Sequence, residues 1–531
     1  MEASITIKNY RCFPASRPVR FVLERGFIAF VGINNSGKSS LLRFFFEFRN
    51  LFEMLSHPSG NIQQALSGRP QPFSYANTVK DIEELFHNRN DLGIEIIVEV
   101  LDLAQTANSH NVDYVTKIVV SVPRRTNTWV IDVFTHTGKI AIGERTGWNS
   151  TMLQVEERPR VDFEKIFEPL HLMASTLYLA AFRNAINAGG GNTLFDIQVG
   201  KNFITAWKNY KQGNVKKYAE AAYSLSKQIR TLFGVEDLDI SPGADDETLQ
   251  IALNGKPFRL DELGSGLAQF ILVLGNAAIQ PRSMIMIDEP ELNLHPSIQI
   301  PFLTTLASYA TDGVVLFSTH LFGLAKATAD QINTLQKISD SESEVLAISK
   351  NHRLAEFLGE LGYSSYREVG FEQVVLVEGV TDVKVIQHFL SLFHEKRRFL
   401  VLPLGGGQMI NGKYQEELVE ITRIAPKIVS IIDSERDSEG AAISQGRRDF
   451  EKVCEPLGIT CHVLKRRAIE NYLSDGAVKQ TFGLEYRALA PYERLDSISP
   501  RWGKSENWRA ALKMDKDTLQ STDIGQFLQS L

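Results

Sequence analysis

Cysteine is scarce in this sequence. The 531 residues include three cysteines, Cys12, Cys454 and Cys461, and no CxxC pair. An odd number of cysteines argues against a disulfide framework, and the lack of paired spacing argues against a zinc site. The sequence therefore predicts a protein of a reducing, cytoplasmic environment.

Long hydrophobic runs are also lacking. No apolar stretch approaches the ~20 residues that a membrane-spanning helix needs. The first residues alternate between polar and apolar, as in a strand and unlike a signal peptide. We therefore expect no membrane partner. The net charge of −6 is modest, so any nucleic acid would have to bind a local basic patch.

Helix-like and strand-like segments alternate in the manner of an α/β protein, and at roughly 150 residues per domain the length suggests two to four domains. Between residues 94 and 134 three strand-like runs predict an antiparallel lobe. The pattern also predicts an inserted helical segment over Phe203–Leu232 and a hairpin turning at Asn254-Gly255. Further expected elements are a strand at Ser4–Tyr10 and helices at Ser40–Leu55 and Val79–His87.

A phosphate-binding loop is the clearest motif. Residues Gly32–Ser39 read Gly-Ile-Asn-Asn-Ser-Gly-Lys-Ser, which fits GxxxxGK[ST], between a short apolar strand and a helix. Backbone N–H groups of such a loop surround the phosphates, the lysine reaches the β- and γ-phosphates, and the serine binds Mg²⁺. The predicted nucleotide-binding residues here are Asn34, Asn35, Gly37, Lys38, Ser39 and Ser40.

A second motif of nucleotide hydrolysis lies about 250 residues later. The apolar run Ser283–Ile287 ends in Asp288 and Glu289. Asp288 suits the Walker B role of holding Mg²⁺ with Ser39, and Glu289 suits a general base that polarises the attacking water.

The order of the surrounding segments resembles the ABC ATPases. Leu263-Gly264-Ser265-Gly266 precedes an expected helix over Leu267–Ala278, Pro290–Pro296 follows Walker B, and a further strand ends at His320. These segments resemble the signature motif, D-loop and switch histidine of that family, and the Gly-Ser-Gly signature resembles the SMC/RecF-like ATPases of DNA metabolism. The resemblance implies at least a homodimer, in which Ser265 and Gly266 complete the ATP site of the partner. Arg183 and Asn184 are further candidates for contacting nucleotide, or plain surface residues.

A separate group of carboxylates follows strand-like runs in the last third of the chain. The runs Glu372–Val377 and Lys427–Ile432 end in Glu378 and Asp433, and Val401–Leu404 between them ends in three glycines. In an open parallel sheet these strand ends share one edge, so the carboxylates should converge there. Carboxylates brought together need cations, and Mg²⁺ fits such a set and activates water for phosphodiester cleavage.

This arrangement resembles the Toprim domain of topoisomerases, primases and a class of nucleases. Glu435 stands where that domain has a second aspartate, and Asp437 is a nearby substitute. Glu470-Asn471-Tyr472 resembles a late glutamate-containing element of Toprim nucleases. The resemblance implies a metal-binding, catalytic set made of Glu378, Asp382, Asp433, Glu435 and Glu470.

Basic residues lie close to these carboxylates in the sequence. Lys465, Arg466 and Arg467 form a cluster that either holds the phosphates flanking a scissile bond or is a solvated face. Arg397-Arg398 and Arg447-Arg448 are expected to be plain surface.

An ABC ATPase fused to a Toprim domain resembles the OLD (overcoming lysogenisation defect) family, over roughly residues 1–475. The expected divisions are an ATPase head (1–350, with a helical dimerisation insertion near 185–240), a Rossmann-like Toprim domain (365–475) and a helical extension (476–531). The boundary between the first two domains should fall near 345–370.

This resemblance implies metal-dependent DNA cleavage controlled by ATP, with Mg²⁺ or Mn²⁺, in bacterial anti-phage defence. Gabija nucleases and retron-associated effectors are relatives, so a defence-system protein or retron nucleic acid is a candidate partner. Two alternatives stay open. One is an ATP-driven DNA sensor or clamp with an inert Toprim fold, suggested by the Asp-x-Glu departure; the other is cleavage of RNA.

Overall fold

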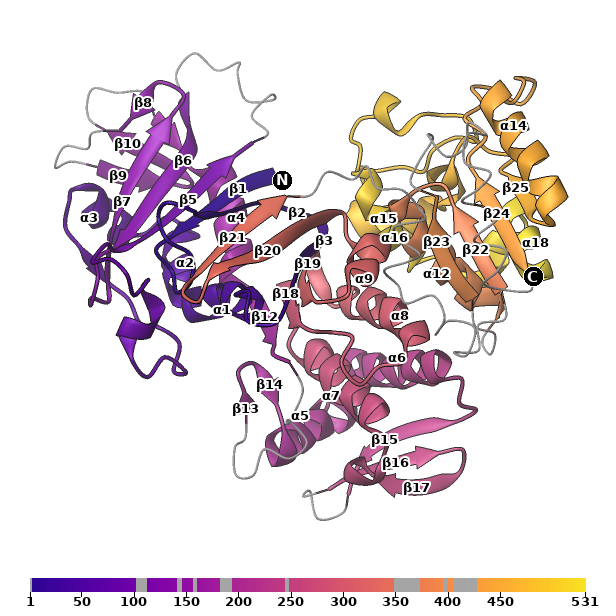
Figure 1. The fold of residues 1–531 in the computed structure, drawn as a ribbon, viewed down its shortest axis with the longest axis horizontal. Helices are drawn as coiled ribbons and strands as arrows, with labels where there is room; N and C mark the ends of the chain where they lie inside the picture. The colour runs from indigo at the N-terminus through magenta and orange to yellow at the C-terminus, as the bar shows by residue number, and fades with distance from the viewer. Residues whose placement is uncertain are drawn as a thin grey trace.

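The computed structural model describes residues 2–101, 112–140, 146–155, 160–181, 193–243, 248–347, 373–394, 399–404, 418 and 427–531. These residues form a mixed α/β structure, as predicted, with an antiparallel lobe, a central mostly parallel sheet and a C-terminal parallel sheet (Figure 1). Several predicted features lie outside the described residues: Arg183, Asn184, Arg397-Arg398, Gly405–Gly407 and most of the expected boundary at 345–370. Of the helices that the structure describes, none has both the length and the apolar character needed to cross a bilayer.

The central sheet has six strands in the order β12-β18-β19-β3-β20-β21. The first five are parallel and β21 is an antiparallel edge strand. Alternate residues of β3 enter two different cores: Ile28 and Phe30 pack with α1, whereas Phe27 and Ala29 pack with α7, α8 and α9. The elements are β3 (Gly26–Gly32), β12 (Thr176–Leu179), β18 (Arg282–Asp288), β19 (Ala310–Thr319), β20 (Gln331–Ser339), β21 (Glu342–Ala347), α1 (Lys38–Glu47), α7 (Ser265–Ile279), α8 (Pro296–Ala307) and α9 (Phe322–Thr328).

The antiparallel lobe is built on alternating burial, as predicted. Five of its strands form a run of antiparallel neighbours in the order β2-β1-β5-β6-β7. They are β1 (Glu2–Lys8), β2 (Val19–Glu24), β5 (Ile94–Val100), β6 (Val112–Val122) and β7 (Thr128–Thr135). Every second residue of these strands points into a core shared with α1, α2 (Arg49–Leu55) and α4 (Glu164–Ala174).

Two predicted helices differ from the structure. The single helix expected over Ser40–Leu55 is two helices, because Phe48 between α1 and α2 has φ −102° and ψ 10° while its ring packs against Phe73 and Tyr75. The helix expected over Val79–His87 is the short 3-10 turn η1 (Ile82–Leu85), because the backbone N–H of His87 donates to Asn9 and draws the chain toward the lobe.

The insertion before α7 is a helical hairpin, α5 (Gly200–Gln212) and α6 (Lys216–Phe233), followed by a three-stranded sheet. The sheet contains β15 (Leu238–Pro242), β16 (Leu249–Leu253) and β17 (Lys256–Arg259). Asn254 and Gly255 have φ angles of 50° and 75°, the left-handed conformation that a type I′ hairpin requires. The predicted hairpin is therefore confirmed.

The C-terminal sheet has four parallel strands in the order β23-β22-β24-β25. From β22 the chain crosses to one side and from β24 to the other, so the edge between these two strands is a topological switch point, where sites form. Helices α16, α17 and α18 of the last 55 or so residues pack against α12. The elements are β22 (Gln373–Val377), β23 (Phe399–Pro403), β24 (Ile428–Ile432), β25 (Thr460–Val463), α12 (Val380–Phe393), α14 (Gln445–Cys454), α15 (Asp475–Phe482), α16 (Asn507–Ala511), α17 (Lys516–Gln520) and α18 (Asp523–Ser530).

Candidate functional site

The phosphate loop follows the buried strand β3 directly. Gly37 has φ 95°, and a Cβ there would collide with Cys12 and Phe13, so glycine is required. Lys38 Nζ donates to the carbonyls of Gly32 (2.8 Å) and Ile33 (2.9 Å), which folds the lysine over the loop. Burial lowers the pKa of Lys38, against the opposing effect of Glu289 and other nearby carboxylates. The loop leads into the N-terminus of α1, where backbone N–H groups and the Lys38 ammonium together suit an anion.

Walker B lies beside the loop. Asp288, at the end of β18, accepts hydrogen bonds from the hydroxyls of Ser318 and Ser39. Burial raises the pKa of Asp288, while those two hydroxyls act in the opposite sense. Glu289 is buried and has φ 51°, a backbone conformation that is uncommon for residues other than glycine. Ser39 and Asp288 are therefore together, as the predicted shared Mg²⁺ site requires.

A residue that was not singled out from the sequence fixes the end of β19. Glu291 Oε1 accepts from Thr319 Oγ1 (2.6 Å) and from the backbone N–H of His320, and lies 3.2 Å from His320 Nδ1. Burial raises the pKa of Glu291. The half-exposed His320, predicted as the switch, is thus held by the Glu291 carboxylate, three residues after Asp288. The third acidic residue in the run Asp-Glu-Pro-Glu is the sequence feature that could have pointed to Glu291.

The signature segment opens α7. Ser265 is the first residue of that helix and is exposed, as is Gly264. A Cβ on Gly266 would lie 2.9 Å from the carbonyl oxygen of Asn293, in the segment predicted as the D-loop. The predicted partner-facing residues Ser265 and Gly266 therefore lie next to the D-loop.

The second group of carboxylates converges at the switch point, as predicted. Glu378 follows β22 and Asp433 follows β24, and the Asp433 N–H donates to Glu378 Oε2 at 3.2 Å. Asp382, in the first turn of α12, accepts from the Gly379 N–H at 2.9 Å. Asp382 and Asp433 are buried, and Glu378 is largely buried.

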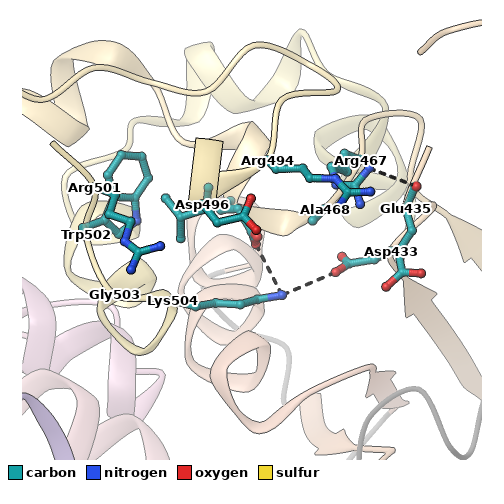
Figure 2. A pocket seen from close by; sticks show the side chains of 12 residues that line it. Asp433, Glu435, Arg467, Ala468, Arg494, Asp496, Arg501, Trp502, Gly503 and Lys504 are labelled. Carbon is teal, nitrogen blue, oxygen red and sulfur yellow. Dashed lines mark hydrogen bonds and ion pairs between the residues drawn. The ribbon is translucent and has the colours of Figure 1, made fainter. Parts of the chain in front are cut away.

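Glu470 and Lys504 complete this group. Glu470 lies on the turn η6 (Ile469–Tyr472), whose Ile469 N–H donates to Asp433 Oδ1 at 3.1 Å. Lys504 Nζ lies 3.7 Å from Asp433 Oδ2 and 3.6 Å from Glu470 Oε2 (Figure 2). Lys504 was not predicted, because it is in the segment 476–531 that the sequence indicates only as a helical extension.

The pKa values of the groups at this edge of the sheet are raised, as a surplus of buried negative charge would raise them. Burial, followed by repulsion from Asp382, raises the pKa of Asp433 well above its usual range. Burial also raises the pKa of Glu378 and of Asp382. Although burial acts to lower it, the surrounding carboxylates raise the pKa of Lys504. The group therefore favours a cation at its centre, and the Lys504 ammonium supplies one.

Arg447 corrects an expectation from the sequence. It was expected to be plain surface, but it is buried, and its guanidinium contacts Glu378 (3.3 Å), Glu435 Oε2 (3.0 Å) and the Asp433 carbonyl. Glu435 has φ 52° and a half-exposed side chain. Asp437, considered as a substitute ligand, instead pairs with Arg467 and Arg494.

Charged side chains of both signs line a pocket of about 490 Å³ beside Asp433 and Glu470 (Figure 2). Of the predicted cluster, only Arg467 lines it; Lys465 has an exposed side chain, and Arg466 lies over the ring of Tyr472. Most of the positive lining comes from the segment after residue 490, namely Arg494, Arg501 and Lys504.

Carboxylate oxygens are ligands that suit Mg²⁺, although in this structure the carboxylates do not form a complete coordination shell. Within the described part of the chain, no group of three or more His, Cys, Asp and Glu side chains is arranged to hold a metal ion. Glu470 Oε2 is buried without a hydrogen-bond partner, and the pKa values of its neighbours are raised. Buried oxygen donors with unmet demand for positive charge fit a hard divalent cation.

Comparisons with known proteins support the ATPase half. The family described as "AAA domain, putative AbiEii toxin, Type IV TA system" matches residues 180–324, which hold the signature, Walker B and His320. No curated protein matches the sequence.

Similar solved structures are SMC head domains, all with low identity and low TM-scores. One SMC head bound to the C-terminal winged-helix domain of ScpA has 14% identity and TM-score 0.37 over 65% of this chain and 97% of that one. The SMC head from Thermotoga maritima has 15% identity and a TM-score of 0.31, over 65% of this chain and 98% of that one. A third is an SMC head domain with an extended coiled coil, bound to the C-terminal domain of ScpA, derived from Pyrococcus furiosus. It has 12% identity and a TM-score of 0.34, over 69% of this chain and 100% of that one.

Together, the phosphate loop beside Walker B and the match over residues 180–324 indicate that this chain carries a P-loop ATPase domain with an ABC-like arrangement of motifs.

Proposed function

We propose that this protein is an ATP-binding, metal-dependent DNA endonuclease, in which nucleotide bound at the ATPase site controls cleavage at the C-terminal carboxylates. The observation that carries the nuclease half is the convergence of Glu378, Asp382, Asp433 and Glu470 around one cation, Lys504, beside a pocket to which three arginines contribute. Four acidic groups and a pocket lined with arginines form a combination suited to a phosphodiester and the cation that assists its cleavage.

The ATPase half has residues for each role. Lys38 and the N-terminus of α1 would hold the β- and γ-phosphates, Ser39 and Asp288 would hold Mg²⁺, and Glu289 would orient and polarise the attacking water. The signature residues of one copy would complete the ATP site of another. A homodimer through the ATPase domains is therefore part of the proposal.

In the C-terminal half, Glu378, Asp382, Asp433, Glu435 and Glu470 would hold Mg²⁺ or Mn²⁺, which when bound would activate water and stabilise the leaving oxygen. Arg467, Arg494 and Arg501 would bind the phosphates on either side of the scissile bond. Lys504 would neutralise charge at the reacting phosphate. Arg447 would keep Glu378 and Glu435 in place by pairing with both.

The biological role proposed is bacterial anti-phage defence. Its support is the resemblance of the motifs to the OLD family, together with the matched family, whose description reads "putative AbiEii toxin, Type IV TA system". A defence-system protein or a retron nucleic acid would then be the partner.

The test is plasmid cleavage. Purified protein with plasmid DNA and Mg²⁺ or Mn²⁺ should nick or linearise it, with and without ATP, and Glu378→Ala should abolish this while remaining folded. Because Glu378 contacts Arg447, the milder Glu378→Gln should also be compared. Cleavage that persists in both variants would contradict the assignment.

A second candidate is an ATP-driven DNA sensor or clamp whose C-terminal domain does not cleave. Lys504 at the centre of the carboxylates, and the lack of a finished metal shell among the described residues, favour it. Tight DNA binding without cleavage under any divalent metal would support it. Cleavage of RNA in place of DNA is a further variant, which an RNA substrate in the same assay would reveal.

A further inference from the structure

Positive charge is concentrated on the helical hairpin α5–α6. Seven of the chain's 57 Lys and Arg residues lie in these two helices, but only one of its 63 Asp and Glu residues, Glu220. The chain as a whole carries a net charge of −6, so this hairpin is a basic element on an acidic protein. The basic residues are Lys201, Lys208, Lys211, Lys216, Lys217, Lys227 and Arg230, of which Lys211 is buried and paired with Asp239.

One face of the hairpin is packed and the other points outward. Phe203, Ile204 and Trp207 of α5 and Leu225 and Ile229 of α6 are buried in the core. The exposed residues of α6 include Lys216, Lys217 and Lys227. Lys216, Tyr223 and Lys227 are seven and four residues apart, which places them on one side of the helix, together with Glu220.

Aromatic rings are exposed among these lysines. Tyr223 and Tyr218 are 61% and 48% exposed, so their rings are open to a partner. Tyr218 stacks on Tyr210 with centroids 5.2 Å apart, so its ring is held in place, and Lys211 Nζ lies 5.4 Å from the centroid of Tyr223. Lysines that contact phosphates and tyrosines that stack on bases are the two elements of surfaces that bind nucleic acid.

From this charge and exposure we infer that the outer face of α5–α6 is a nucleic-acid-binding surface that prefers strands with unpaired bases. The proposal deepens the proposed function and rests on nucleic acid being the substrate. The family resemblance led us to expect dimerisation at this insertion, but a second copy of the chain fits its outer face less well, because two such surfaces would bring like charges together.

The hairpin is also anchored to the helix that carries the signature motif. A Cβ on Gly275 of α7 would lie 2.7 Å from the ring of Phe203, so α5 and α7 are in close contact at this glycine. Trp207 Nε1 and Lys211 Nζ donate to the Ile240 carbonyl, which fixes α5 to the neighbouring sheet as well. Nucleic acid on this surface would therefore lie on a hairpin that packs directly against the helix beginning at Ser265.

The test is fluorescence anisotropy with a labelled DNA single strand and the matching duplex, in EDTA so that nothing is cleaved. The variant is Lys216→Glu/Lys217→Glu/Lys227→Glu. The control is Lys80→Glu/Lys337→Glu/Lys513→Glu, which changes three exposed lysines elsewhere and therefore the net charge equally. The hairpin variant should lose roughly tenfold or more in affinity, and its dependence on salt should be weaker by about one power for each lost phosphate contact. Tyr223→Ala should weaken single-strand binding more than duplex binding.

Equal affinity in the hairpin and control variants would overturn the proposal. So would a hairpin variant that changes its mass by sedimentation and keeps its affinity, because the face would then join two copies. Wild-type protein that binds DNA through this face and cleaves nothing with Mg²⁺ would leave the surface in place and remove the proposed nuclease, so the two failures are distinguishable.

Discussion

Lys384 and Asp330 form a buried ion pair between the two parallel sheets, with Nζ and Oδ2 3.0 Å apart and both side chains almost fully buried. Lys384 follows Asp382 by two residues, and its ammonium lies 3.9 Å from the ring centroid of Phe27. Asp330 Oδ2 also accepts from the Phe27 N–H at 2.9 Å. Phe27 belongs to β3, which leads directly into the phosphate loop. A continuous buried contact therefore joins the helix of the carboxylates to the strand of the ATP site.

Lys384→Met should destabilise the protein by about 3–5 kcal/mol, because the buried Asp330 carboxylate loses its partner. Thermal or urea unfolding would measure this. The double variant Lys384→Met/Asp330→Leu should recover much of the loss, since it removes both charges, and the exposed Lys513→Met should be neutral. A single variant as stable as wild type would show that the pair is not needed to join the sheets.

Lys504→Met should make stability depend on divalent ions. It removes the only cation that the structure pairs with both Asp433 and Glu470 in the described residues. Because the Lys504 side chain is 45% exposed, the expected cost is smaller than for Lys384, roughly 1–2 kcal/mol near neutral pH. Mg²⁺ should restore the unfolding midpoint of the variant more than that of wild type. Equal effects of Mg²⁺ on both would argue against a metal at these carboxylates.

Asp433→Asn should stabilise the metal-free protein at neutral pH. Burial raises the pKa of Asp433 above its ordinary 3.8, so the protonated form is favoured in the folded state. The stability linked to this group is fully present below pH 3.8 and is lost as the pH rises through the raised value. The asparagine amide cannot ionise and avoids this loss. Unfolding midpoints in EDTA should therefore differ most at neutral pH and converge in acid; a difference that grows in acid would contradict the sign.

Glu289→Gln should lower ATP hydrolysis by about 10²–10⁴-fold while ATP still binds, because the amide cannot polarise the attacking water. Lys38→Ala should weaken ATP binding itself. Phosphate release and binding of a labelled nucleotide would separate the two effects, with the exposed Glu99→Gln as control. Undiminished hydrolysis by Glu289→Gln would remove its role as general base.

Some features of the two sites depend only on residues that are close together in the sequence, and these features were predicted. The glycine loop at Gly37, the hairpin at Asn254-Gly255 and the strand ends carrying Glu378 and Asp433 all follow from patterns within a few residues. The parallel pairing of β22 and β24 then brings the last two together, as the strand patterns predicted.

Long-range contacts were beyond such patterns. Arg447 contacts Glu378 across 69 residues, and Lys504 reaches Asp433 from a segment whose composition predicts only helix. Phe48 interrupts a helical pattern because tertiary aromatic packing outweighs local helix propensity. Of the cations at the C-terminal site, Arg467 belongs to the cluster predicted from the sequence, whereas Arg447 and Lys504 are brought to the carboxylates only by the fold.

The most direct test is DNA cleavage measured across ATP concentrations for wild type, Lys38→Ala and Glu378→Ala. Wild-type cleavage should change with ATP, Lys38→Ala should cleave at a rate independent of ATP, and Glu378→Ala should not cleave at any ATP concentration. Cleavage by Glu378→Ala at the wild-type rate, or an unchanged ATP response in Lys38→Ala, would show that these carboxylates are not a nuclease site controlled by the ATP site.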